Sequence, residues 1–75
     1  MKFRKVSSSE FLRAVKRSPL PTVLHNLKTE IWIFKTNKCI WFCRFNHDST
    51  SKILSVEFEQ QLAKIKGITF HHYGA

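Results

Sequence analysis

The chain has 75 residues and a mass of 8.9 kDa, which is enough for one small domain over residues 1–75 and too little for two. Hydrophobic residues make up 43% of it and Gly and Pro number two each, so the composition is that of a folded chain and excludes a disordered one. Thirteen Lys and Arg against five Asp and Glu give a net charge of +8, which favours polyanionic partners, with nucleic acid ahead of membranes and acidic proteins.

The positive charge is distributed unevenly along the chain. Residues 1–17 contain six cations and one carboxylate, residues 18–46 contain four and one, and residues 47–75 contain three of each. The excess therefore lies in the first two-thirds of the sequence. A basic surface that serves only solubility is the alternative interpretation.

The first predicted element is a helix that begins after Ser7. Ser7 and Glu10 have the spacing of a capping box, and Val6 and Phe11 have that of a hydrophobic staple. The helix is predicted to end before Pro19, because the residue that precedes a proline is disfavoured in helical geometry. Its cations gather on the face opposite to its apolar residues: Arg13, Lys16 and Arg17. The segment 22–28 that follows is ambiguous, since it is short and its apolar residues have helical spacing.

Residues 29–46 are predicted to form a β-hairpin. Two runs rich in Ile, Trp, Phe and Thr flank Asn37-Lys38, which can make a two-residue turn that pairs residues whose numbers sum to 75. Alternate residues point to opposite faces, and here both faces are apolar. One face would carry Trp32, Phe34, Cys39, Trp41, Cys43 and Phe45, and the other would carry Ile31, Ile33, Lys35, Ile40, Phe42 and Arg44.

A second helix over residues 57–66 and a closing strand over residues 68–73 complete the predicted elements. Ser55 would cap this helix and Gly67 would end it. The order predicts an α+β two-layer domain, with two helices on an antiparallel sheet of about three strands. Two short helices cover only one face of a sheet, so apolar side chains stay uncovered on the other face, and such patches mark interaction sites.

The leading functional hypothesis is a small basic regulatory protein that binds DNA or RNA without catalysis. Rings that stack on bases and cations that contact phosphates are the groups that hold nucleic acids. The candidate stacking or interface residues are Trp32, Phe34 and Trp41, although core packing is the more common role of such rings in a small domain. The candidate phosphate-binding residues are Lys2, Arg4, Lys5, Arg13, Lys16, Arg17, Lys28, Lys35, Lys38 and Arg44.

Two other functions are consistent with the sequence. The first is a protein-binding inhibitor or adaptor that uses the exposed apolar sheet face, and its binding would be nearly insensitive to salt. The second is a metal-independent RNase toxin, since histidine exchanges protons near neutral pH. Its candidate residues are His71, His72 and Tyr73, acting with Lys35 or Arg44. A frayed edge strand explains the same C-terminal residues, so an enzyme is the less favoured interpretation.

No metal or other cofactor is expected from residue spacing. Cys39 and Cys43 would lie roughly 13 Å apart on a strand, too far to share one ion or to form a disulfide. His47 and the His71-His72 pair lack the ligand spacing of a zinc module. Two glycines cannot form a phosphate-cradling loop.

A cytoplasmic protein without membrane contact is expected. No apolar run of signal-peptide or membrane-spanning length occurs, and free thiols fit a reducing compartment. The uncovered sheet face predicts a homodimer, because a symmetric pair is the commonest way to bury such a face. Alternatively, residues 22–28 or the N-terminal arm could fold over it within one chain.

Overall fold

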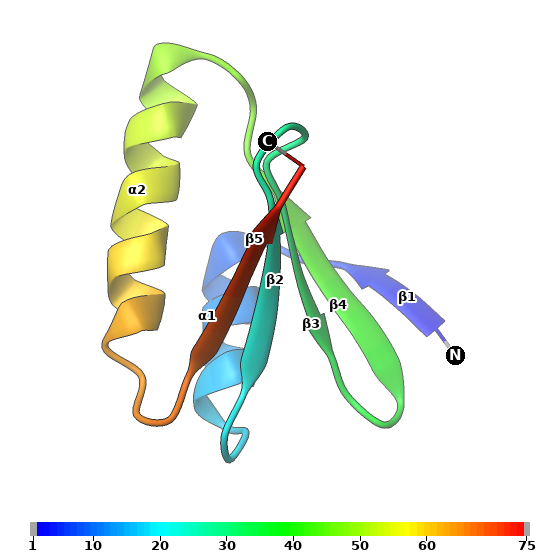
Figure 1. Ribbon diagram of the computed structural model, residues 1–75. Helices are drawn as coiled ribbons and strands as arrows, with labels where there is room; N and C mark the ends of the chain where they lie inside the picture. The colour runs from blue at the N-terminus through cyan, green and yellow to red at the C-terminus, as the bar shows by residue number, and fades with distance from the viewer. Residues whose placement is uncertain (1, 75) are drawn as a thin grey trace.

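The computed structural model describes residues 2–74, in which two helices pack on one face of a five-stranded sheet (Figure 1). The elements are β1 (Lys2–Lys5), α1 (Ser8–Lys16), β2 (Thr22–Asn26), β3 (Ile31–Lys35), β4 (Cys39–Arg44), α2 (Ser49–Ala63) and β5 (Thr69–Tyr73). The strand order is β1-β4-β3-β2-β5. The α+β class is confirmed. The prediction of about three antiparallel strands is wrong, because the sheet is mixed and each of its edge strands is parallel to its neighbour.

Helix α1 begins where its capping signals predict. The Ser7 hydroxyl oxygen accepts a hydrogen bond from the Glu10 backbone N–H at 3.2 Å, and Arg17 is the C-cap. Val6 and Phe11, the two staple residues, belong to the same buried cluster. The Glu10 carboxylate accepts from the Ser7 hydroxyl at 3.4 Å rather than from the Ser7 backbone N–H, so the Ser7 N-cap forms without the full capping box. The N-cap and the hydrophobic staple fix the angle at which the chain enters this helix.

The β3–β4 hairpin has the predicted register. Ile31 pairs with Arg44 and Phe34 with Trp41, so partner numbers sum to 75. Thr36 closes the turn, because its backbone N–H donates to the Cys39 carbonyl at 2.8 Å and its hydroxyl oxygen accepts from the Cys39 N–H at 3.1 Å.

Strands β1 and β2 account for the error in strand number. β1 is a basic, exposed edge strand with no apolar alternation, and it is held by parallel pairing with β4. β2 lies between β3 and β5, and its pairing overrides the helical spacing of its apolar residues. Both segments extend the sheet, so neither folds over its uncovered face.

Helix α2 begins earlier than predicted. Asp48 is the N-cap, and its carboxylate accepts the Ser51 backbone N–H at 2.8 Å. Ser55, the predicted cap, is buried in the middle of the helix, and the helix ends at Ala63 rather than at residue 66. β5 forms as predicted but runs parallel to β2. No helix within residues 2–74 has the length and apolar character needed to cross a membrane.

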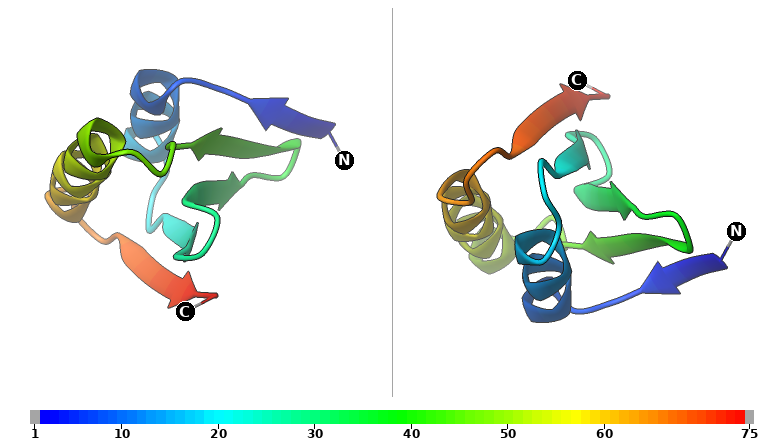
Figure 2. Two further views of the ribbon diagram at one scale, coloured as in Figure 1. Left: turned by 90° about the horizontal axis from the view of Figure 1, so that it is seen from above. Right: turned by 90° about the horizontal axis from the view of Figure 1, so that it is seen from below.

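The core lies between the sheet and the two helices. Phe11 and Trp32 are fully buried, and Phe58 contacts both rings edge-on at centroid distances of 5.6 and 5.2 Å. Figure 2 shows that both helices lie on the same side and that the chain ends lie at opposite edges of the sheet. The other side of the sheet has no covering element among the described residues.

Candidate nucleic-acid interface

Two of the three candidate stacking or interface rings are core residues, which was the alternative interpretation of them. Trp32 is 0% exposed and Phe34 is 4% exposed, and both face the helices. A base could reach either ring only if the helices left the sheet, so neither ring offers a stacking surface in the folded chain. Trp41 is half-buried at the margin of the helix layer, where the Arg4 guanidinium lies 4.7 Å from the centre of its ring.

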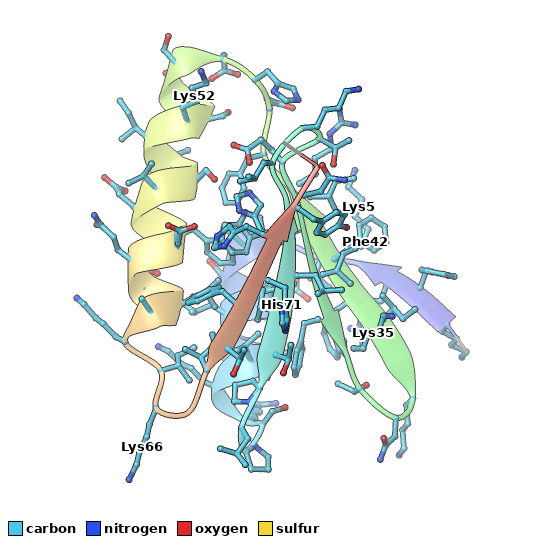
Figure 3. All side chains as sticks on the ribbon, in the orientation of Figure 1. Lys5, Lys35, Phe42, Lys52, Lys66 and His71 are labelled. Atoms are coloured by element: carbon cyan, nitrogen blue, oxygen red, sulfur yellow. The ribbon has the colours of Figure 1, made fainter. Side chains whose placement is uncertain are left out.

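The uncovered side of the sheet, which we call the open face, has an apolar centre and basic margins. The strand registers place the following residues on it: Phe3 and Lys5 of β1; Ile40, Phe42 and Arg44 of β4; Ile31, Ile33 and Lys35 of β3; Thr22, Leu24 and Asn26 of β2; and Thr69, His71 and Tyr73 of β5. One row across the sheet runs from Lys5 through Phe42 to His71 (Figure 3). Lys35 lies on the same face.

None of the five carboxylates belongs to the open face. They occur in the two helices, at the α2 cap and in the β2–β3 turn: Glu10, Glu30, Asp48, Glu57 and Glu59. Throughout residues 2–74, every ion pair with a carboxylate involves a histidine, so all thirteen Lys and Arg are unpaired. The open face therefore combines apolar and aromatic side chains with uncompensated positive charge.

Three rings are available on the open face. Phe3 is 74% exposed and Tyr73 is 44% exposed, at opposite edges of the sheet, while Phe42 is half-buried between them. The predicted hairpin register already put Phe42 on the face opposite to that of Trp32. Phe3 and Tyr73 were missed as stacking candidates. The first lies in an unrecognised strand, and the second was considered only for catalysis.

A cavity of about 430 Å³ opens at one end of the open face, between the α1–β2 loop and the β3–β4 turn. Leu24, Ile33 and Lys35 contribute to its lining, together with loop residues 18–21. Its volume is within the range of small-molecule pockets, about 300–1,000 Å³. The open face thus has a recess beside a lysine.

The cations of the N-terminal arm and of α1 meet in a separate cleft. Arg4, Arg13 and Arg17 line a space of about 290 Å³ together with Trp41 and Glu10. This arginine cleft lies on the helix side of β1, whereas Lys5 lies on its open side. The remaining predicted phosphate contacts are dispersed: Lys2 at the start of β1, Lys16 at the end of α1, Lys28 in the β2–β3 turn and Lys38 in the β3–β4 turn.

The residues of the ribonuclease hypothesis are divided between the two faces. His71 and Tyr73 point to the open face, whereas the adjacent His72 points to the helix side. β2 separates His71 from Lys35, and β2 and β3 separate it from Arg44. Adjacent strands lie about 4.8 Å apart, so the Cα atoms of Lys35 and Arg44 are at least roughly 10 and 14 Å from that of His71.

Protein-family models, curated protein sequences and solved structures were all compared with the chain, and none of them matches it. The fold and its surface define a class: a small α+β protein with one helix-covered face and one basic, ring-bearing open face.

Proposed function

We propose that the protein binds single-stranded nucleic acid on its open face, as a non-catalytic, regulatory binding protein. The observation that carries this proposal is the uneven distribution of charge, since the open face holds Lys5, Lys35 and Arg44 and no Asp or Glu side chain. Proteins that bind single strands combine a positively charged path for the backbone with rings on which bases stack. Phe3, Phe42 and Tyr73 are positioned to supply the rings.

Two features favour a single strand over a duplex. Stacking on exposed rings requires unpaired bases, because the bases of a duplex already stack on one another. The arginine cleft also adjoins the open face across β1, so it can hold phosphates of a strand that passes over this edge.

A protein-binding adaptor is the second candidate function. It is supported by α2, whose outer side exposes Ile53 (61%), Leu54 (49%) and Val56 (57%). Exposed apolar side chains grouped in this way are typical of protein interaction sites.

Fluorescence anisotropy with labelled RNA, single-stranded DNA and duplex DNA of one sequence tests the proposal. We expect tighter binding of the single strands and a salt dependence with a log–log slope of at least about −2 in magnitude. Three phosphates neutralised on the open face give about −2, and each phosphate held in the arginine cleft adds about −0.7. Absence of binding to all three polymers at low salt would overturn the proposal. Salt-insensitive capture of a protein partner would support the adaptor instead.

Matched lysine substitutions locate the binding surface. Lys35→Gln should weaken binding several-fold and reduce the magnitude of the salt slope by about 0.7, because one phosphate contact is lost. Lys66→Gln, the same change beyond the end of α2, should leave both quantities unchanged (Figure 3). Phe3→Ala should cost about 1–3 kcal/mol of binding free energy if a base stacks on this ring. Equal losses in the two lysine variants would mean that net charge, rather than the open face, determines binding.

A further inference from the structure

Three ligand-type side chains meet on the helix side of the sheet, away from the open face. His25 of β2 and His72 of β5 are register partners in a parallel pair, so both point to the same side, and Glu59 of α2 contacts them. His72 Nε2 lies 3.0 Å from Glu59 Oε1, and His25 Nδ1 lies 3.9 Å from it. One ligand atom from each residue falls within 4.8 Å of the other two.

His25 is held with one ring nitrogen free to act as a ligand. The residue is 5% exposed, and its ring stacks on Trp32 at a centroid distance of 3.8 Å. Its Nε2 lies 2.6 Å from a Glu30 carboxylate oxygen, and an ionised carboxylate only accepts, so Nε2 is the donor. With the hydrogen on Nε2, the neutral ring has its lone pair on Nδ1, and this atom is buried without a hydrogen-bond partner in the described chain.

The β2–β3 turn places the Glu30 carboxylate that fixes this tautomer. Glu30 has a φ of +57°, a left-handed conformation that few residues other than glycine adopt. The Asn26 side chain stabilises the turn by accepting the backbone N–H groups of Lys28 and Thr29 at 2.9 and 3.0 Å. The strained β2–β3 turn therefore holds the Glu30 carboxylate against the ring of His25.

We infer that His25 Nδ1, His72 Nε2 and Glu59 form a binding site for a divalent transition-metal ion, with Zn²⁺ as the best fit. Tetrahedral zinc ligands at 2.0–2.1 Å from the ion lie about 3.4 Å from one another, between the 3.0 and 3.9 Å separations of this cluster. Two imidazoles and one carboxylate form a donor set that zinc takes while keeping a fourth position open. Mg²⁺ and Ca²⁺ prefer oxygen ligands and suit it poorly.

The surroundings of the cluster fit this assignment. Metal-binding histidines commonly donate their second ring N–H to a carboxylate, as His25 does to Glu30. His25 and Glu59 also line a cleft of about 250 Å³, which gives an ion and its water a route to the site. His72 Nε2 donates to Glu59, so this nitrogen would have to lose its hydrogen, which the neutral ring can carry on Nδ1 instead, in order to bind an ion.

Zn²⁺ titration of the full chain by calorimetry, with thermal melting, tests the inference. We expect one ion per chain and a rise in Tm, since a ligand that binds only the folded state stabilises it. Cu²⁺ should quench tryptophan fluorescence, because the proposed ligand His25 stacks on Trp32. Glu59→Gln and His72→Gln should each weaken Zn²⁺ binding at least about tenfold. Their side chains are 45% and 37% exposed, so these changes leave the core intact.

Neighbouring residues of the same types serve as controls. Glu57→Gln changes an exposed carboxylate of the same helix, and His71→Gln changes the open face of the same strand. Neither should alter Zn²⁺ affinity. Cys39→Ser, which removes a half-buried thiol outside the cluster, should not alter it either. Absence of Zn²⁺ binding would overturn the inference. So would a control variant that loses as much Zn²⁺ affinity as Glu59→Gln does. The zinc cluster and the open face lie on opposite sides of the sheet, so the Zn²⁺ titration and the nucleic-acid binding assay can fail independently of each other.

Discussion

At the scale of single residues, the two cysteines of β4 show how depth controls reactivity. Cys39 is half-buried at the start of the strand, whereas Cys43 is 3% exposed, and burial raises the pKa of the Cys43 thiol to about 12. The thiolate is the reactive form, so Cys43 should be inert near neutral pH. We expect iodoacetamide at pH 8 to modify Cys39 in the native protein and Cys43 only after denaturation, as mass spectrometry can show. Equal native rates at both sites would contradict this expectation.

The sequence predicted which hairpin residues share a face but not which face is inside. The register follows from the Asn37-Lys38 turn alone, and it is correct. Both faces are apolar, so nothing local distinguishes the Trp32 side from the Phe42 side. The side chosen depends on where α1 and α2 cross the sheet, which distant strand pairings determine. The His25–Glu59–His72 cluster was missed for a similar reason, because its members come from three elements with no ligand spacing between them.

At the scale of elements, the N-cap of α2 makes stability depend on pH. Hydrogen bonds from the backbone and hydroxyl of Ser51 hold the pKa of Asp48 below its usual 3.8. A lowered pKa in the folded state means that the stabilisation is present at neutral pH and is lost as the pH falls below that value.

Two substitutions separate the charge of this cap from its hydrogen bond. Asp48→Asn should keep a Tm close to that of the native chain at pH 7, because Asn is a good N-cap, and it should flatten the acid side of the stability profile. Asp48→Ala should lower the Tm by several degrees at pH 7. Circular-dichroism melts between pH 2 and pH 7 measure both effects. An acid limb of unchanged steepness in Asp48→Asn would show that other groups produce it.

The elements with their own end signals were predicted best. α1 has an N-cap serine at its start and a proline after it, and both of its ends were predicted. The start of α2 was missed because its first turns place Ile53 and Val56 toward solvent, which hides the amphipathic pattern. β1 has no pattern of its own, since all four of its residues are exposed and only pairing with β4 makes it a strand.

At the scale of the whole molecule, the open face can bury its apolar centre against a second copy. Such a dimer would bring Lys5, Lys35 and Arg44 of both copies together, so their repulsion should oppose it at low salt. We predict self-association that strengthens as salt is added, because salt screens this repulsion. Sedimentation equilibrium at two salt concentrations measures it. A mass that stays at 8.9 kDa in both, at high micromolar concentration, would mean that the open face does not pair with itself.

The salt dependence of the dimer is opposite to that of nucleic-acid binding. Added salt weakens contacts with phosphates and strengthens an apolar contact between two like-charged faces. If both events use the open face, a nucleic acid should dissociate the dimer. Sedimentation of the protein with increasing amounts of labelled RNA therefore tests whether RNA binding dissociates the dimer.

The assembly of the sheet from both ends of the chain has a consequence for folding. β1 and β5 are each parallel to a strand far away in sequence, so neither can form as a local hairpin, and a long loop must close before each one pairs. The β3–β4 hairpin has no such delay. We expect β1 and β5 to dock late and to detach first, as strands with few neighbours do. Phe3 and Lys5 belong to β1, and His71 and His72 belong to β5. A nascent or partly unfolded chain therefore lacks parts of both surfaces, so binding competence should appear only with the last strands to fold.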